Sequence, residues 1–184
     1  MSALVGAGYD ALGVDPVSPE GERFVRARYQ ELEPSDVSLR GIDAVVAGRV
    51  LHHVHPLGSG LDRLAEIAPL LLVDEFARGL IRAPAQAWYE EQYRLAVATG
   101  REPPGPPSLD EWREGHPDLH AHDLLLEALG ARYRQTALEW VPYLHRWLGD
   151  PAAEARELEL IEAGAFPAVG WRWAGSRRAD PPSG

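Results

Sequence analysis

Short runs of apolar residues, each stopped by a proline or by acidic residues, divide the first half of the chain into expected strands. These strands are expected at 11–14, 24–27, 42–47 and 70–73. Between the last two, apolar residues recur at helical spacing from Leu57 to Ala68. A strand, a helix and a strand in about 35 residues form a βαβ unit, so this half predicts a parallel α/β sheet.

The second half is richer in helical patterns. Helices are expected at 84–98, 123–132 and 152–163, and strands at 134–140 and 169–173. A proline-rich connector, 101–108, ends at Ser108, which has capping-box spacing to Glu111 and so predicts another short helix. Gly164 marks the end of the 152–163 helix, and the stretch from Glu154 to Glu162 is expected to be solvated.

Composition narrows the class of protein. The 184 residues suit one domain, and the net charge of −10 argues against a general nucleic-acid binder, which needs cations to displace counterions. The absence of cysteine excludes disulfides, zinc–thiolate sites and cysteine nucleophiles. No apolar run is long enough for a membrane span and no secretory signal is visible, so a cytoplasmic location is expected.

Four stretches carry a resemblance to a known family. In order along the chain they are YDALGVDP, FVRARYQEL, IDAVVAGRVLHHV and LLLVDEF, and AFPAVGWRWAG is similar to the closing strand of the same fold. Together they resemble the small-molecule branch of the class I S-adenosylmethionine-dependent methyltransferases. The resemblance implies a Rossmann-like, doubly wound α/β fold with a mostly parallel sheet and a C-terminal antiparallel strand pair.

The same resemblance implies the domain layout and the cofactor site. Residues 1–176 are expected to form one methyltransferase-like domain, with 83–132 as a helical lid or insertion and 177–184 as a flexible tail. S-adenosylmethionine is the expected cofactor. Its contacts are expected at Asp15, Tyr29, Gln30 and Arg49.

Asp15 is the best supported of these contacts, because an acid at the end of a strand can accept hydrogen bonds from both ribose hydroxyls. A turn aspartate before Pro16 is the alternative. Tyr29 and Gln30 fall where the family touches adenine. Arg28 stands where the family often has an acid, so a contact through that side chain is not implied.

The chain opens on Gly6-Ala7-Gly8, which has the composition of a nucleotide-binding glycine loop. Such a loop needs a strand before it and a helix between it and the acid, and the few residues from Gly8 to Asp15 leave no room for a helix. These glycines are therefore expected to cap and turn a helix end. The first strand and glycine loop of the family are expected to be missing.

A missing first strand would leave the strands at 11–14 and 42–47 without a neighbour. Three explanations stay open: the natural chain begins further upstream, the two strands pair directly, or another chain donates a strand. We favour the first. Unpaired strand edges also make a homodimer a possible partner arrangement, beside the small-molecule methyl acceptor.

Histidines follow the strand at 42–47, in the segment that in the family borders the methyl donor and the acceptor. Histidine can take a proton from an oxygen or nitrogen acceptor near neutral pH. We expect His53 to be the base or acceptor-positioning group, with His52 as the second candidate. Substrate contacts are expected at His55, Glu75, Tyr89 and Tyr93.

Plainer interpretations compete with these assignments. A histidine can pack in the sheet, and an aromatic stripe such as Tyr89 and Tyr93 is more often core than pocket. The pairs His53/His55 and His120/His122 could also ligate a metal in a hydrolase, completed by acids. The expected function is methyl transfer from S-adenosylmethionine to a small molecule, with cofactor binding and turnover expected to be weakened by the missing glycine loop. A non-catalytic binding or assembly protein of the same fold is the alternative.

Overall fold

The structure, a computed structural model, describes residues 2–17, 21–32 and 41–178. It is a mixed α/β protein with both parallel and antiparallel strand pairs and seven α-helices among these residues. No helix in this part of the chain combines the length and apolar character needed to cross a membrane.

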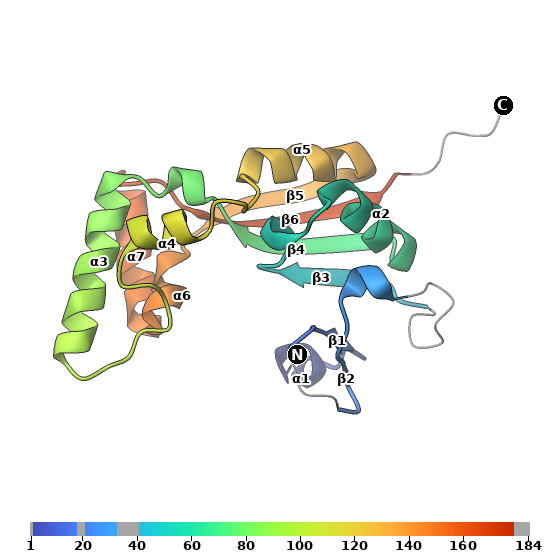
Figure 1. The fold of residues 1–184 in the computed structure, drawn as a ribbon, viewed down its shortest axis with the longest axis horizontal. Helices are drawn as coiled ribbons and strands as arrows, with labels where there is room; N and C mark the ends of the chain where they lie inside the picture. Colours follow the sequence, from blue (N-terminus) through green and yellow to red (C-terminus); the bar gives the residue numbers. More distant parts are fainter. Residues whose placement is uncertain (1, 18–20, 33–40, 179–184) are drawn as a thin grey trace.

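A four-stranded sheet forms the centre of the molecule (Figure 1). Its order is β3 (Ala44–Gly48), β4 (Leu70–Phe76), β6 (Gly170–Arg177) and β5 (Tyr133–Val141). The β3–β4 pair is parallel, whereas β6 is antiparallel to both β4 and β5. The antiparallel closing strand is therefore confirmed, but this sheet is not mostly parallel, because two of its three pairs are antiparallel.

The N-terminal residues form a small unit that contains α1 (Ser2–Gly6), β1 (Gly13–Val14), β2 (Phe24–Val25) and the 3₁₀ turn η1 (Tyr29–Glu31), and Tyr29 packs it against the main core cluster. Strands β1 and β2 pair in parallel as a two-stranded sheet. Within the described residues β3 pairs with β4 alone, so the direct pairing of 11–14 with 42–47 does not occur. Gly8 follows α1 with a φ of 89°, which confirms the expected helix-ending turn.

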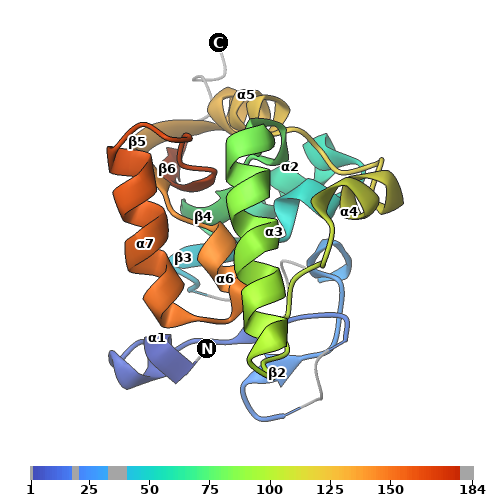
Figure 2. The ribbon, with the colours of Figure 1, turned by 90° about the vertical axis from the view of Figure 1, so that its left-hand side faces the viewer.

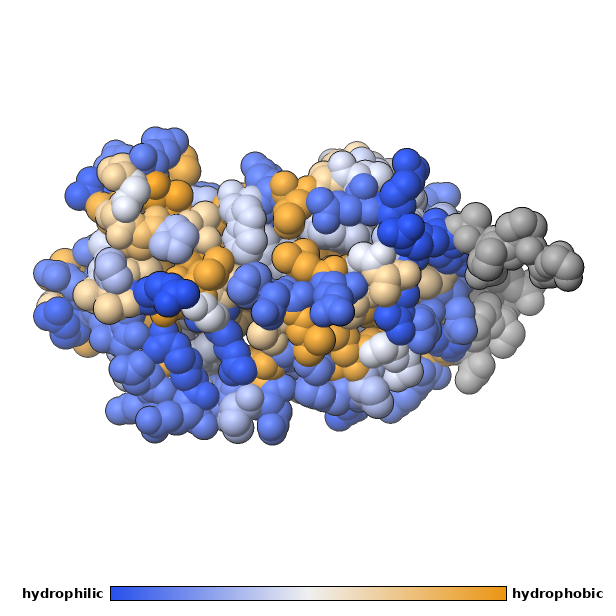
Figure 3. All heavy atoms as spheres, turned by 90° about the horizontal axis from the view of Figure 1, so that it is seen from above, coloured by the Kyte–Doolittle hydropathy of each residue, from blue (hydrophilic) through white to orange (hydrophobic). Residues whose placement is uncertain are grey.

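Two helices cover one face of the large sheet. These are α2 (Leu57–Ile67) and α5 (His122–Arg132), which lie above the strands in Figure 1. Leu71 and Val73 of β4 point into this layer and are buried with Leu61 and Leu129 in one core cluster. Seen from above, this side of the molecule mixes hydrophobic patches with hydrophilic residues (Figure 3).

The alternate positions of the strands face the other way. Val46 of β3 pairs with Leu72 of β4, and these side chains are 55% and 42% exposed. Because side chains alternate across a strand, both lie on the face opposite α2 and α5. This face of the sheet thus carries exposed apolar residues within the described part of the chain.

A second core cluster lies beyond the carboxyl ends of β3 and β4. It is built by α3 (Ala83–Ala98), α4 (Leu109–Gly115), α6 (Leu144–Leu148) and α7 (Pro151–Glu162), preceded by the 3₁₀ turn η4 (Arg78–Leu80). Figure 2 shows α3, α6 and α7 side by side. Ser108 caps α4 by accepting a hydrogen bond from Glu111 N at 3.3 Å, as its spacing predicts.

The ends of the predicted domain differ from the expected bounds. Strand β6 runs to Arg177, whose backbone N–H donates to Pro69 O at 2.8 Å, and Arg178 N donates to Arg132 O. The first two residues of the predicted tail are thus hydrogen-bonded, and 179–184 lie outside the described residues. The segment 83–132 contains α3, α4 and α5, and its role as a lid stays a prediction.

Candidate functional site

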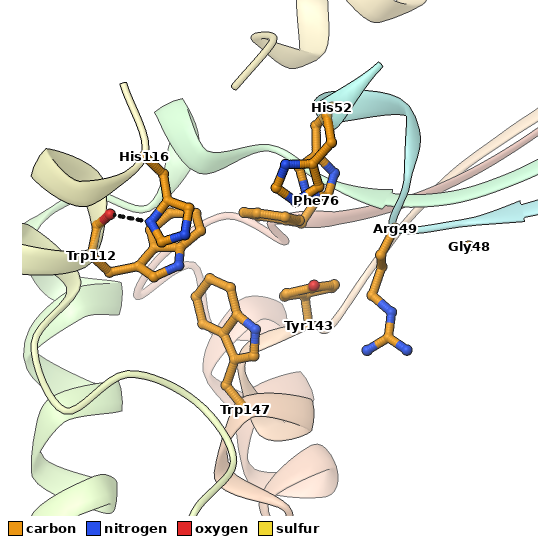
Figure 4. A pocket seen from close by; sticks show the side chains of 9 residues that line it. Gly48, Arg49, His52, Phe76, Trp112, His116, Tyr143 and Trp147 are labelled. Atoms are coloured by element: carbon orange, nitrogen blue, oxygen red, sulfur yellow. Dashed lines mark hydrogen bonds between the residues drawn. The ribbon is translucent and has the colours of Figure 1, made fainter. Parts of the chain in front are cut away.

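A cavity of about 340 Å³ lies where the parallel strands β3 and β4 end (Figure 4). The carboxyl ends of parallel strands are where open α/β sheets bind ligands. The lining residues are Gly48, Arg49, His52, His53, Phe76, Trp112, His116, Tyr143 and Trp147. A Cβ placed on Gly48 would meet no atom within 4 Å, so the backbone at the end of β3 is open to a ligand.

The most buried polar pair of the site joins β4 to the segment after β3. The 3₁₀ turn η3 (Leu51–His53) follows β3 directly and places His52 beside Glu75 of β4. His52 Nδ1 lies 2.6 Å from Glu75 Oε2, and Leu51 N donates to Glu75 Oε1 at 2.8 Å. Glu75 is fully buried and His52 is 6% exposed. The carboxylate therefore fixes the His52 ring and leaves Nε2 as the nitrogen that a ligand can reach.

His53 lies next to this pair and is more exposed. Its ring centroid is 4.2 Å from that of His52. Partial burial lowers the pKa of His53 below 6.5, and the neighbouring His52 lowers it further, while Glu75 acts in the opposite direction. His53 is consequently uncharged at neutral pH.

Arg49 follows β3 in a backbone conformation that is rare for a side-chain-bearing residue. Its φ is +56°, and its N–H donates to Asp74 O at 2.7 Å. Left-handed non-glycine residues cost about 1–3 kcal/mol and cluster at functional sites. The two acids of β4, Asp74 and Glu75, are bound by Arg146 and His52, and no described carboxylate forms an ion pair with the Arg49 guanidinium.

Four aromatic rings form the rest of the wall. Phe76 stacks on Tyr143 with centroids 4.8 Å apart, and Trp147 meets Phe76 edge-on at 5.3 Å. The ring centroids of Trp112 and Trp147 lie 5.2 Å apart. Such offset and edge-on pairs are the favoured geometries of aromatic side chains.

His116 completes this side of the cavity. It stacks on Trp112 at 5.0 Å, and its Nδ1 lies 2.8 Å from Trp112 O. In Figure 4 Trp112 and His116 lie across the cavity from Arg49.

The Tyr143 hydroxyl is part of the polar lining. Burial raises the pKa of Tyr143 to about 12, although a hydrogen bond to Arg49 and the Arg49 charge oppose the shift. The phenol is therefore protonated at neutral pH and can donate a hydrogen bond.

Helix α6 carries Trp147 and is held in place by a buried acid. The sequence pattern predicted that this acid would be solvated. Glu157 of α7 is fully buried. Its Oε1 accepts from Tyr143 N and Leu144 N at 2.8 and 3.0 Å, and its Oε2 accepts from His145 N at 2.8 Å. The expectation of a solvated Glu154–Glu162 face is wrong at Glu157, because the orphan amides at the start of α6 need an acceptor.

The structure brings some of the predicted site residues together. His52, His53 and Arg49 line the cavity, and Glu75 lies behind His52. His55 instead contacts Asp118 O through Nε2 at 2.9 Å, and its ring is tilted against that of His120 with the centroids 4.2 Å apart.

The two predicted tyrosines lie elsewhere. Tyr89 and Tyr93 pack in or against the second core cluster, outside the cavity lining, and the buried Tyr89 hydroxyl donates to Pro106 O at 2.8 Å. Burial, helped by the neighbouring Tyr93 and Glu90, raises the pKa of Tyr89.

The cofactor residues predicted near the N-terminus lie in the small unit. Asp15 follows β1 as expected, and its Oδ1 accepts from Val17 N at 2.7 Å, which is the contact of a turn aspartate. Tyr29 packs against α2, where a Cβ on Gly60 would lie 2.7 Å from its hydroxyl oxygen. Burial raises the pKa of Tyr29 to about 12, with a smaller contribution from Tyr133. Gln30 is exposed.

The histidine pairs considered as metal ligands are not arranged with acidic side chains as a metal site in the described part of the chain. Among the described residues no group of three or more histidine, aspartate and glutamate side chains is arranged to hold a metal ion. His120 uses Nε2 for a contact with Val54 O at 2.8 Å.

Five lining side chains were absent from the sequence-based prediction. They are Phe76, Trp112, His116, Tyr143 and Trp147. Phe76 and Tyr143 each lie a few residues past an expected strand, 70–73 and 134–140, so aromatic residues that follow strands were the available signal. Nothing in the pattern linked Trp112 or His116 to that edge of the sheet.

The sequence matches no protein-family model and no curated protein. One solved structure to which the chain is similar is a cyclopropane-fatty-acyl-phospholipid synthase-like protein from Lactobacillus casei, with 14% identity and a TM-score of 0.38. The match covers 86% of this chain and 65% of that one, so the chain spans less than two thirds of that structure's length. Likeness at this level assigns no activity.

Proposed function

We propose that this protein transfers a methyl group from S-adenosylmethionine to a small molecule bound in the cavity at the ends of β3 and β4. The observation that carries the proposal is the buried His52–Glu75 pair, which presents an oriented imidazole where such sheets bind ligands. The closing strand β6, which is antiparallel to β4 and to β5, agrees with the C-terminal antiparallel pair that the sequence resemblance implies.

Two described residues support the cofactor part of the proposal, although Asp15 Oδ1 already accepts a hydrogen bond from Val17 N. Asp15 stands at the end of β1, where its carboxylate is suited to ribose hydroxyls. Gly48 leaves the end of β3 open, so a ligand can approach the backbone there. When bound, S-adenosylmethionine supplies an electrophilic methyl group on a positively charged sulfur.

The protein's own contribution is mainly positioning, exclusion of water and removal of a proton. The aromatic wall excludes water from the acceptor, which strengthens electrostatic interactions in the cavity. Glu75 holds His52 Nδ1, so Nε2 takes the proton of an acceptor hydroxyl. The geometry favours His52 over His53 as the base, because the Glu75 carboxylate fixes only the His52 ring.

Calorimetry with S-adenosylmethionine and S-adenosylhomocysteine tests the cofactor part of the proposal. Asp15→Ala should weaken binding by about 1.5–3 kcal/mol, the range for hydrogen bonds to a charged group. Asp10→Ala is the matched control in the same unit, because the Asp10 side chain is 97% exposed and bonded only to Arg23 in the described contacts. Absence of binding to either compound would refute the proposal, and binding without turnover would favour the non-catalytic alternative.

A further inference from the structure

The charge of the cavity restricts what it can hold. Arg49 is the one formally charged side chain among the described lining residues, and the lining also has three histidines but no acid. The two neighbouring acids form ion pairs elsewhere, Asp74 through Oδ2 with Arg146 at 2.6 Å and Glu75 with His52, and neither lines the cavity, although Asp74 Oδ1 is buried without a hydrogen-bond partner. A cationic ligand would therefore meet a cation without a counter-charge, whereas an anionic group would complete an ion pair.

The aromatic rings select the shape of the ligand. Aromatic cages can also bind cations through their faces, but a cation in the same site repels a cationic ligand. Here Arg49 occupies one side of the cavity and the rings of Trp112 and Trp147 lie on other sides (Figure 4). A volume of about 340 Å³ is near the lower end for ligand pockets, so it suits a compound of one or two rings.

The polar groups fall into two sets on different elements. Arg49 and the protonated Tyr143 hydroxyl can both donate to one anionic group. His52 and His53 come from η3 and can accept a proton. A ligand that uses both sets carries an acidic group and a hydroxyl on one flat frame.

We propose that the acceptor is a hydroxylated aromatic acid, held through its carboxylate by Arg49 and Tyr143 and presenting its hydroxyl to His52. That this ligand accepts a methyl group rests on the proposed function, but the class of ligand does not depend on it. In the reaction the aryl oxygen bonds to the methyl carbon, the electron pair of the broken S–C bond stays on sulfur, and the phenolic proton passes to His52 Nε2.

Binding of three probes to the whole chain without cofactor tests the ligand class. The probes are 4-hydroxybenzoate, cyclohexanecarboxylate, which keeps the charge but lacks the ring, and benzyltrimethylammonium, which keeps the ring and reverses the charge. Calorimetry should show binding of the first, with the second at least about tenfold weaker because ring stacking is lost. The cation should neither bind nor compete. Preference for the cation, or equal binding of the two acids, would overturn the inference.

Variants then locate the subsites. Arg49→Gln should weaken 4-hydroxybenzoate binding about tenfold or more, and Arg49→Lys should recover part of it. Arg94→Gln, at an exposed arginine of α3, is the matched control. Trp147→Leu should also weaken the probe, whereas Trp140→Leu on β5, outside the cavity, should not.

The same variants separate this inference from the proposed function. If Arg49→Gln weakens S-adenosylhomocysteine and leaves 4-hydroxybenzoate unchanged, Arg49 serves the cofactor and the inference is wrong. If the probe binds as expected but no methyl transfer occurs with S-adenosylmethionine, the ligand class holds and the proposed function fails. Should Arg49→Gln not fold, the probe series on the unaltered protein still decides the ligand class.

Discussion

Two buried glutamates of this protein each bind a histidine and backbone amides, yet their surroundings give them different tasks. Glu75 accepts from Leu51 N and contacts His52, while Glu157 accepts from three consecutive amides at the start of α6 and contacts His145. Both carboxylates are fully buried. The pairs differ in what the second nitrogen of the histidine faces.

His145 is enclosed by acids. Its Nδ1 lies 3.0 Å from Glu157 Oε2 and its Nε2 lies 3.8 Å from Glu154 Oε1. His52 has one ring nitrogen on Glu75, and the ring lines the cavity. A Glu–His pair is therefore a structural anchor at His145, where both ring nitrogens face protein groups. At His52 it is a candidate base, because one ring nitrogen is left for a ligand.

The first prediction removes the Glu157 carboxylate, which anchors the start of α6. Glu157→Gln should lower the free energy of unfolding by about 2–4 kcal/mol, because it removes a buried charge on which several donors converge. Urea denaturation measures this loss. Glu154→Gln on the same helix is the control and should change stability by less than about 0.5 kcal/mol, as expected for an exposed side chain. A loss under about 1 kcal/mol for Glu157→Gln would show that α6 does not depend on this acid.

The second prediction concerns the cavity pair. If the proposed methyl transfer is correct, Glu75→Gln should slow it about a hundredfold, the scale of general-base assistance, because His52 loses its orientation and its carboxylate partner. His52→Gln should have a similar effect, and the double variant should be little worse because the two act as a unit. Steady-state rates with a hydroxylated aromatic acid measure this. His145→Gln is the control, and an equal loss of rate in it would remove the distinction between the pairs.

Backbone conformation extends the comparison. Both segments contain a left-handed residue, but α6 ends on Gly149 with φ +62°, whereas β3 is followed by Arg49 with φ +56°. Arg49→Gly should raise the free energy of unfolding by about 0.5–1 kcal/mol while weakening ligand binding. Gly149→Ala should lower stability by about 1 kcal/mol or more. Thermal or urea unfolding measures both, and a destabilised Arg49→Gly would mean that the arginine is structural.

The last prediction is a small pH dependence of stability that arises from His53, beside the cavity. The pKa of His53 is lowered in the folded protein, mainly by desolvation and then by His52, so the unfolded chain takes up this proton first as pH falls. Its contribution to stability is complete above pH 6.5 and is lost as pH falls through the lower folded pKa. The size is modest because the side chain is exposed. The free energy of unfolding, measured from pH 5 to 8, should depend less on pH in His53→Gln than in the unaltered protein. His122→Gln should leave the dependence unchanged.

Much of the secondary structure could be predicted because it depends on local pattern. The helix at Leu57–Ile67, the Ser108 cap, the turn at Gly8 and the closing strand β6 lie where periodicity and capping residues indicate. The short helix α6 was not predicted, because five residues give no periodicity and its amides are satisfied by Glu157 from another helix.

The candidate site was predicted in part. His52, His53 and Arg49 follow one strand, so a single position in the chain identifies them. Trp112, His116 and Trp147 reach the same cavity from α4, from the residue that follows it, and from α6. Their convergence depends on how helices far apart in the chain pack on the second core cluster, which no local pattern encodes.

Local pattern along the chain indicates where strands and helices form, that an acid follows β1, and that histidines follow β3, since these depend on neighbouring residues. Packing between distant segments sets which glutamates are buried, which histidine a buried acid holds beside the cavity, and which rings enclose that space. Glu75 and Glu157 look equally polar in the sequence. Burial and hydrogen-bond partners are set by packing between distant segments, and these decide what a charged side chain does.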